Sequence, residues 1–174
     1  MALVVLLRGV NVGGHRIFRP ATLAERLKHL EVVNFGAAGT FVIRQPIGHA
    51  QLRAEFARRL PFDAHIMICA GHEIVRLLTR DFFRGHAARP NIVRFVSVLS
   101  RSPRTALAPP LTLPAAGEWL VRILAREGRF VVGVHRRHMK AIGCLRSLDQ
   151  VFGAPATTRS WNTFAAIART LEQG

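Results

Sequence analysis

The sequence has few acidic residues, few thiols and no tyrosine: ten Asp and Glu and two Cys occur among 174 residues. Cys69 and Cys144 follow no secretory signal, so we expect reduced thiols and a cytoplasmic protein. Long hydrophobic runs are also missing, because the apolar segment Leu3 to Leu7 ends at Arg8. A segment of this length is too short for a membrane span or a signal peptide, and we expect no membrane partner.

The scarcity of carboxylates weakens the case for an enzyme. The ten acidic residues include no recognisable pair for general acid and base catalysis. A G-x-S-x-G elbow, a G-x-G-x-x-G fingerprint and a Walker loop are all absent from the sequence. The eight histidines include no H-E-x-x-H motif, and no cysteine pair has zinc spacing. We therefore expect no metal and no cofactor, identify no catalytic residue, and favour a protein that is not an enzyme.

Positive charge is what the sequence has in excess. The formal net charge is +15, carried by 23 Arg and two Lys. Charge of this size attracts polyanions without fixing a fold. The most basic stretch contains no Asp or Glu, and its cations are Arg129, Arg136, Arg137, Lys140 and Arg146. These side chains either contact phosphates in a salt-dependent, sequence-independent way or form a solvated face. Aromatic residues make up only 7% of the chain, so bases have few rings on which to stack.

Hydrophobic periodicity predicts an α+β protein in two halves. The first half, residues 1–79, has the order βαββαβ of a ferredoxin-like unit, with strands over 3–7, 32–35, 40–44 and 65–69 and helices over 20–30 and 49–60. The second half, residues 80–174, is a smaller α+β part with strands over 92–99, 119–126 and 129–135, a proline-rich loop over 102–117, and helices over 145–152 and 162–172. Because residues 3–7 are apolar on both faces, we expect the second half to pack on the first.

A polar, glycine-rich loop follows the first strand and carries Arg8, Asn11, Gly13 and Gly14. Glycine-exposed N–H groups and the Arg8 guanidinium are suited to an anion or polar ligand. In the structural alternative, Arg8 and Asn11 only satisfy carbonyl groups of the loop.

A second polar motif, Thr157 to Thr163, opens the last predicted helix. Asn162 is predicted as its N-cap, while Arg159, Thr163 and the N–H groups of the first turn are suited to an anion. In the structural alternative Asn162 is only a cap, Trp161 belongs to the core and Arg159 is a surface charge. Our sharper hypothesis is that this motif and the Arg8–Asn11 loop converge on one ligand pocket.

The two motifs, LLRGVNVGG and T-x-R-x-W-N-T, together with a glycine hairpin between them, resemble the bacterial family called domain of unknown function 1697. The resemblance spans about residues 2–172. It implies an α+β fold with a ferredoxin-like first half, and it implies no established activity.

These observations leave three functional hypotheses. The first is non-enzymatic binding of a polyanion, in particular nucleic acid, through the Arg-rich surface. The alternative is a small-molecule-binding protein or an enzyme whose polar pocket is formed by the Arg8–Asn11 loop and the Arg159–Asn162 helix start. A third is an interaction scaffold that dimerises through an exposed sheet edge, although nothing in the sequence indicates a homo-oligomer.

Overall fold

The apolar run that opens the chain forms β1 (Leu3–Arg8), an interior strand of a four-stranded antiparallel sheet. The computed structural model describes residues 1–11, 14, 16–104 and 107–174. The sheet has the order β2-β3-β1-β4, with β2 at Val32–Asn34, β3 at Thr40–Ile43 and β4 at His65–Ala70. No residue from Leu3 to Leu7 is more than 5% exposed, as expected for a strand that is apolar on both faces.

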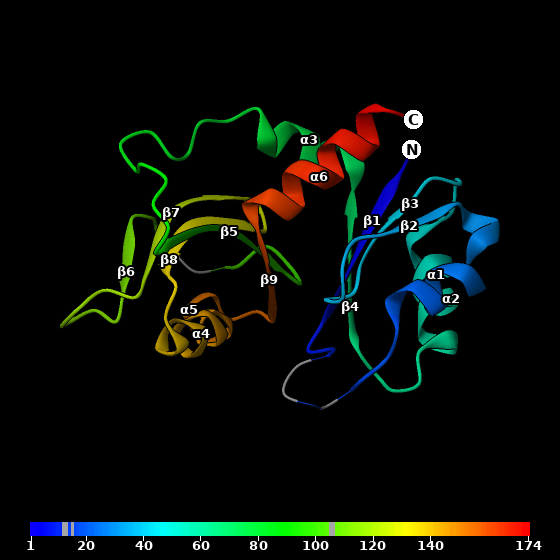
Figure 1. Cartoon of the computed structure of the whole chain (residues 1–174), viewed down its shortest axis with the longest axis horizontal. Helices are drawn as coiled ribbons and strands as arrows, with labels where there is room; N and C mark the ends of the chain where they lie inside the picture. The colour runs from blue at the N-terminus through cyan, green and yellow to red at the C-terminus, as the bar shows by residue number, and fades with distance from the viewer. Residues whose placement is uncertain (12–13, 15, 105–106) are drawn as a thin grey trace. The chain divides into compact units, whose positions relative to one another are not determined.

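Two helices, α1 (Pro20–Arg26) and α2 (His49–Arg59), lie on the same side of this sheet (Figure 1). Leucine and phenylalanine side chains spaced four residues apart form their buried stripes, and they join the β1 side chains in one core: Leu23, Leu27, Leu52, Phe56, Leu3, Val5 and Leu7. The order of these elements is the predicted βαββαβ, with one added 3-10 turn at Lys28–Leu30. The ferredoxin-like assignment itself stays a prediction.

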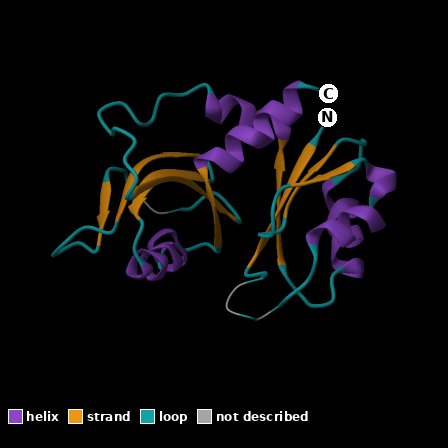
Figure 2. Cartoon of the chain, in the orientation of Figure 1, coloured by secondary structure: helices purple, strands orange, loops and turns teal. Residues whose placement is uncertain are grey.

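A second antiparallel sheet has the order β6-β7-β8-β5-β9 (Figure 2). The three predicted strands are present as β5 (Ile92–Leu99), β7 (Val121–Glu127) and β8 (Phe130–Arg136). Two more strands, β6 (Leu111–Leu113) and β9 (Ala156–Ser160), were not predicted. The first is three residues long within the proline-rich segment, and the second is polar, so neither has a strong hydrophobic signal.

The α+β class is confirmed, and the helices of the second part differ from the prediction at one point. Instead of one helix over 145–152, the chain forms α4 (Met139–Arg146) and α5 (Leu148–Phe152). The remaining helices are α3 (Gly71–Leu78) and α6 (Trp161–Glu172). None of the helices in the described ranges is long and apolar enough to cross a bilayer.

The chain divides into two compact units. Unit 1 contains residues 1–78 and 165–174, and unit 2 contains residues 79–164, so α6 begins in unit 2 and ends in unit 1. The predicted domain boundary after residue 79 and the packing of one half on the other both stay predictions.

Helices α4 and α5 cover one face of the unit 2 sheet, where Leu148 and Phe152 pack in one core with Phe95 and Ile123 (Figure 1). Gly133 of β8 is required on this face, because a Cβ atom there would lie 2.9 Å from the Phe95 ring and would collide with a backbone carbonyl. The close approach of ring and strand therefore depends on a residue without a side chain.

The opposite face of this sheet carries arginine side chains. Successive residues of a strand point to opposite faces, so Arg94 and Arg122, which neighbour the core residues Phe95 and Ile123, point away from α4 and α5. Both pair with Val134 across the sheet, and Arg136, two residues further along β8, lies on the same face. The strand register thus brings together three cations from separate parts of the sequence.

Candidate functional site

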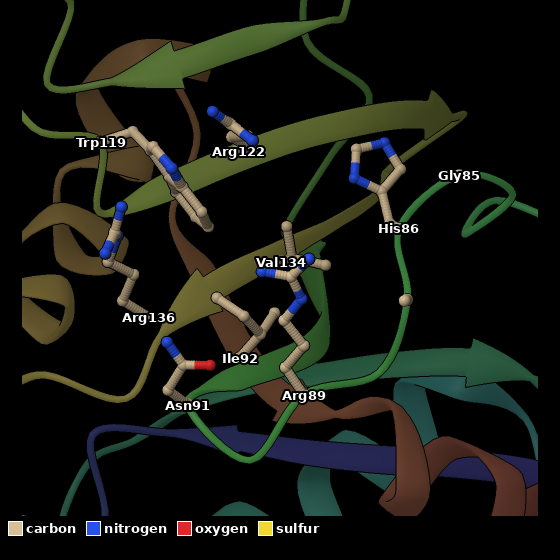
Figure 3. Close-up of a pocket in the computed structure, with 10 residues that line it drawn as sticks. Gly85, His86, Arg89, Asn91, Ile92, Trp119, Arg122, Val134 and Arg136 are labelled. Carbon is tan, nitrogen blue, oxygen red and sulfur yellow. The ribbon is translucent and has the colours of Figure 1, made fainter.

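The arginine-bearing face of unit 2 contains a depression of about 270 Å³, which we call the arginine pocket. Its floor contains Ile92 and Val134, and its polar lining is Arg89, Asn91, Trp119, Arg122, Arg136 and His86 (Figure 3). No Asp or Glu lines it.

A second depression of about 510 Å³, which we call the lysine pocket, adjoins the first. The two share Asn91 and Arg136, and the lysine pocket adds Arg137, Lys140, His138 and Glu118. Together they form what we call the basic groove. Five cations and one carboxylate line it, so its net charge is strongly positive.

The indole of Trp119 fixes two of these cations. The guanidinium carbon of Arg122 lies 4.1 Å from the ring centroid, and that of Arg136 lies 4.6 Å from it. Figure 3 shows the ring between the two side chains. Cation–π attraction at these distances restricts both guanidinium groups to the mouth of the arginine pocket. Trp119 therefore orients the two guanidinium groups, and neither face of its ring is open for a nucleic-acid base to stack on.

One carboxylate compensates part of this charge. Glu118 lies 2.9 Å from the Arg136 guanidinium, but its own side chain is 73% exposed, so the surrounding water weakens the pair. Within the described ranges, Arg89 and Arg122 form no ion pair. The arginine pocket therefore keeps uncompensated positive charge.

The wall opposite the sheet is the segment 82–91, and aromatic contacts anchor it. Phe83 packs edge-on against Trp161 at 4.9 Å, and the Arg94 guanidinium lies 4.6 Å from the Phe83 ring. Arg94 also donates a hydrogen bond of 2.9 Å to the carbonyl of His86. This segment carries Arg89, so an exposed cation on the loop lies across the arginine pocket from the cations on the sheet.

The structure separates the five cations that the sequence predicts as one polyanion-binding row. Arg136, Arg137 and Lys140 line the basic groove. Arg129 lies just before β8, at the opposite end of the strand from Arg136, and Arg146 is the last residue of α4. Neither Arg129 nor Arg146 lines the groove. Arg89, Trp119 and Arg122 also line the groove and are not among the residues that the sequence predicts for it. The alternation of Val121, Arg122 and Ile123 was the one available signal, because it places the middle residue opposite the core.

The Arg8–Asn11 loop uses its asparagine structurally. The Asn11 side chain donates a 2.7 Å hydrogen bond to the carbonyl of Ala37 and accepts a 2.9 Å bond from the Phe18 N–H. Its backbone has a φ of 53°, a left-handed conformation that asparagine tolerates. Arg8 is partly buried, Gly14 is exposed with a φ of 75°, and Gly13 lies outside the described residues. These contacts tie the loop to the β2–β3 turn, and a ligand role for it stays a prediction.

The late motif differs from its prediction at the cap. Helix α6 begins at Trp161, so Asn162 lies inside its first turn and the predicted asparagine N-cap is wrong. Ser160 takes that role, because its Oγ accepts a 3.2 Å hydrogen bond from the Thr163 N–H, three residues on. Ser160 Oγ also lies 3.0 Å from the Thr163 hydroxyl.

Arg159 is buried, so its interpretation as a surface charge is wrong. The residue is 9% exposed, and its guanidinium donates hydrogen bonds to the Thr157 hydroxyl at 2.8 Å and to the Thr158 carbonyl at 2.9 Å. Burial lowers the pKa of the Arg159 guanidinium to about 10, because desolvation penalises the charged form. Arg159 belongs to unit 2 and Arg8 to unit 1, so a pocket shared by the two motifs stays a prediction.

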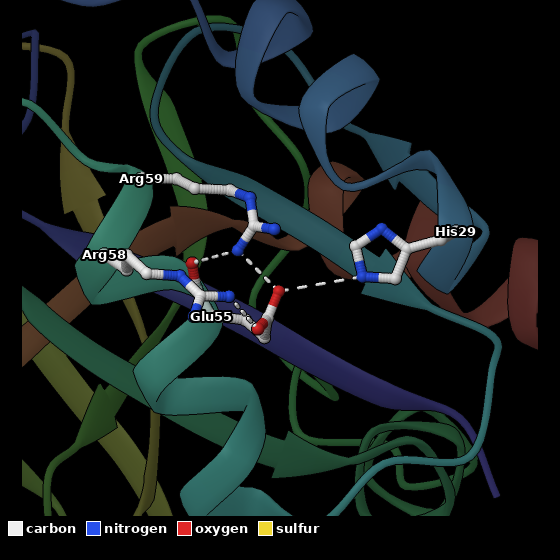
Figure 4. A network of polar contacts seen from close by, with 4 residues as sticks. All are labelled: His29, Glu55, Arg58 and Arg59. Carbon is white, nitrogen blue, oxygen red and sulfur yellow. Dashed lines mark hydrogen bonds and ion pairs between the residues drawn. The ribbon is translucent and has the colours of Figure 1, made fainter.

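Unit 1 has a basic depression of its own, of about 380 Å³, lined in part by Arg19, Arg26 and Arg59. A neighbouring carboxylate forms ion pairs with the arginines at this place (Figure 4). Glu55, only 16% exposed, pairs with both Arg58 and Arg59, and its Oε2 lies 3.6 Å from His29 Nε2. Arg59 is thus paired, whereas Arg19 and Arg26 form no ion pair among the described residues. This depression differs from the basic groove in that no described aromatic ring fixes its arginines.

Two histidines in or near the groove, His138 and His135, have local partners. His138 is the N-cap of α4 and accepts a 3.1 Å hydrogen bond from the Lys140 N–H through Nδ1. His135 Nδ1 lies 2.8 Å from the carbonyl oxygen of Arg136. In the part of the chain that the structure describes, no three His, Cys, Asp or Glu side chains come together as a metal site would require.

Comparison with known proteins places these observations in context. The sequence profile of the family described as "Protein of unknown function (DUF1697)" matches residues 1–118. Among solved structures, the chain is similar to the conserved bacterial protein SP0830 from Streptococcus pneumoniae, with a TM-score of 0.60 and 16% sequence identity over 98% of each chain. At this identity the similarity shows the fold alone. No curated protein matches the sequence.

Proposed function

Because the chain belongs to the DUF1697 family, whose function is unknown, its role has to follow from its own geometry, and we propose that it binds nucleic acid through the phosphate backbone. The binding surface is the basic groove. The observation that carries the proposal is the pair of arginines held on either side of Trp119, next to a third that stands on the opposite wall.

The chemistry of the groove favours phosphate over other partners. Guanidinium groups form paired, charge-assisted hydrogen bonds with phosphate oxygens, and three of them line a space without any carboxylate lining. Fixing these side chains before binding lowers the entropy cost of ordering them on a ligand. A phosphodiester chain that leaves the arginine pocket next meets Arg137 and Lys140 in the lysine pocket.

The same geometry favours binding without base recognition. Arginine side chains occupy both faces of Trp119, so this ring does not serve as a stacking platform. Contacts to phosphate position a nucleic acid but carry no sequence information. We therefore expect similar affinities for strands of different sequence.

The test is binding of generic single-stranded and double-stranded nucleic acid across a salt series. We expect micromolar or tighter binding of at least one form at physiological salt. Affinity should fall roughly 50-fold for a single strand and roughly 150-fold for a duplex between about 50 and 200 mM salt, as expected when about four phosphates are neutralised. Absence of binding at physiological salt, or binding that salt does not weaken, would contradict the proposal.

A further inference from the structure

We infer that the arginine pocket binds the terminal phosphate monoester of a nucleic-acid strand, and that the lysine pocket receives the diester backbone that follows it. This inference rests on the proposed function and adds to it. It names the terminal phosphate as the chemical group that makes one strand bind more tightly than another.

The charge of the pocket matches a monoester better than a diester. Arg89, Arg122 and Arg136 line it, and the one carboxylate paired with them is Glu118 on Arg136. A diester phosphate brings a single negative charge, whereas a terminal monoester carries about −1.5 to −2 near neutral pH. Two uncompensated guanidinium groups thus face a group of nearly equal and opposite charge.

The number of hydrogen-bond donors points in the same direction. A monoester has three terminal oxygens, and a diester has two that are not bonded to carbon. The arginine pocket supplies guanidinium groups from three directions: Arg89 from the loop, Arg122 from β7 and Arg136 from β8 (Figure 3). The Asn91 amide and the His86 ring are further polar groups of the lining. Because the Trp119 ring lies between Arg122 and Arg136, the donors available to one phosphate are Arg89, Arg122 and the Asn91 amide, and these suit three acceptor oxygens better than two.

The size of the pocket is compatible with this group. A volume of about 270 Å³ leaves room for a phosphate and the sugar that carries it. The apolar floor of Ile92 and Val134 is suited to the carbon atoms of that sugar. The wider lysine pocket, joined through Asn91 and Arg136, is where the chain continues.

The pocket is held in shape before any ligand arrives. Arg94 bonds the His86 carbonyl and lies over the Phe83 ring, and Trp161 packs on that ring from the start of α6. The tryptophan of the late sequence motif therefore supports the wall that carries Arg89. A preorganised cluster of cations gains affinity because less ordering is needed on binding.

The experiment compares single strands of about 12 nucleotides that differ only at their ends, each labelled on an internal base. One carries a 5′-phosphate, one a 3′-phosphate and one no terminal phosphate. At physiological salt we expect one of the two phosphorylated strands to bind at least fivefold tighter than the unphosphorylated strand, and which one does so identifies the end that enters the pocket. A nucleoside monophosphate should compete with that strand, and the matching nucleoside should not.

Two variants locate the effect. Arg122→Ala and, on the exposed loop, Arg89→Ala should each reduce the preference for the phosphorylated end to less than twofold. The matched control, Arg146→Ala, removes an exposed arginine that does not line the groove and should keep the full preference. Equal, salt-dependent binding of all three strands would overturn this inference and leave the proposed function standing. Failure of every strand to bind would overturn the proposed function itself.

Discussion

Trp119 shows how one side chain decides what a basic surface can do. An isolated arginine on a strand samples many rotamers, and ordering it on a ligand costs free energy. Here the indole holds Arg122 and Arg136 at 4.1 and 4.6 Å from its centroid. The ring contributes no charge, so its effect on affinity can be separated from theirs by experiment.

Replacing Trp119 with Leu should weaken nucleic-acid binding about three- to tenfold, because two cation–π contacts that orient the guanidinium groups are lost. The slope of log K against log salt should not change, since the number of cations is unchanged. Arg122→Ala, in contrast, should reduce the magnitude of that slope by about one. If Trp119→Leu flattened the slope as much as Arg122→Ala does, the positioning role would be contradicted.

Arg159 provides a second prediction at the residue scale. Burial lowers the pKa of its guanidinium from the ordinary arginine value to about 10, which still leaves it charged near neutral pH. Above about pH 10 the folded protein loses this proton while the unfolded chain keeps it, so stability should rise with pH in that window. Relative to Arg159→Met, the unfolding free energy of the native protein should be constant from about pH 6 to 9.

By about pH 11 the free energy of unfolding of the native protein should increase by about 1 kcal/mol relative to the Arg159→Met variant. Chemical denaturation of both proteins at each pH measures this difference. A difference that falls above about pH 9 would contradict the assigned direction of the pKa.

At the scale of elements, the N-cap of α6 is Ser160, two residues before Asn162, which the sequence pattern predicts as the cap. The motif contains both a serine and an asparagine, and either is a good N-cap residue. Because β9 pairs with β5 as far as Ser160, the strand ends there and the helix begins at the next residue. Pairing between distant segments therefore decides the start of the helix, and local preference does not.

Ser160→Ala should lower the free energy of unfolding by about 1 kcal/mol, because the Thr163 N–H loses its acceptor. Asn162→Ala, within the exposed part of the first turn, should change it by less than about 0.5 kcal/mol. Urea denaturation of the two variants checks the order. A larger loss for Asn162→Ala than for Ser160→Ala would mean that the helix begins later than the structure indicates.

Elements with strong apolar patterns were predictable, and those defined by distant pairing were not. The continuous run Leu3–Leu7 and the regular stripe of α2 gave β1 and α2 close to their true bounds. Helix α4 lacks such a stripe: Gly143 interrupts it, Ile142 is 50% exposed and only Ala141 is buried. Its separation from α5 depends on Ser147, whose hydroxyl bonds the Cys144 carbonyl.

The basic groove was predictable in part for the same reason. Arg136, Arg137 and Lys140 stand close together in the sequence, so their charge is visible without a structure. Arg122 and Arg89 come from separate segments, and they meet Arg136 only because β7 and β8 pair in this register and the 82–91 segment is anchored over the sheet.

At the scale of the whole molecule, a net charge of +15 does not by itself locate a binding surface. Cations are spread over both units, and part of their charge is compensated, as Glu55 compensates one of the two charges of Arg58 and Arg59. The basic groove differs because its cations outnumber its carboxylates and two are fixed by an aromatic ring. Affinity for nucleic acid should therefore depend on where a charge is removed and not only on how many are removed.

The measurement that tests this claim most directly compares two double variants with equal loss of charge. Arg136→Glu with Arg137→Glu reverses charge in the groove, and Arg146→Glu with Arg169→Glu reverses exposed arginines that do not line it. At physiological salt the groove variant should bind single-stranded nucleic acid at least about tenfold more weakly, with a flatter salt dependence, whereas the control should stay within about threefold of the native protein. Equal weakening by both variants would contradict the account, because it would make the groove no more important than the overall charge.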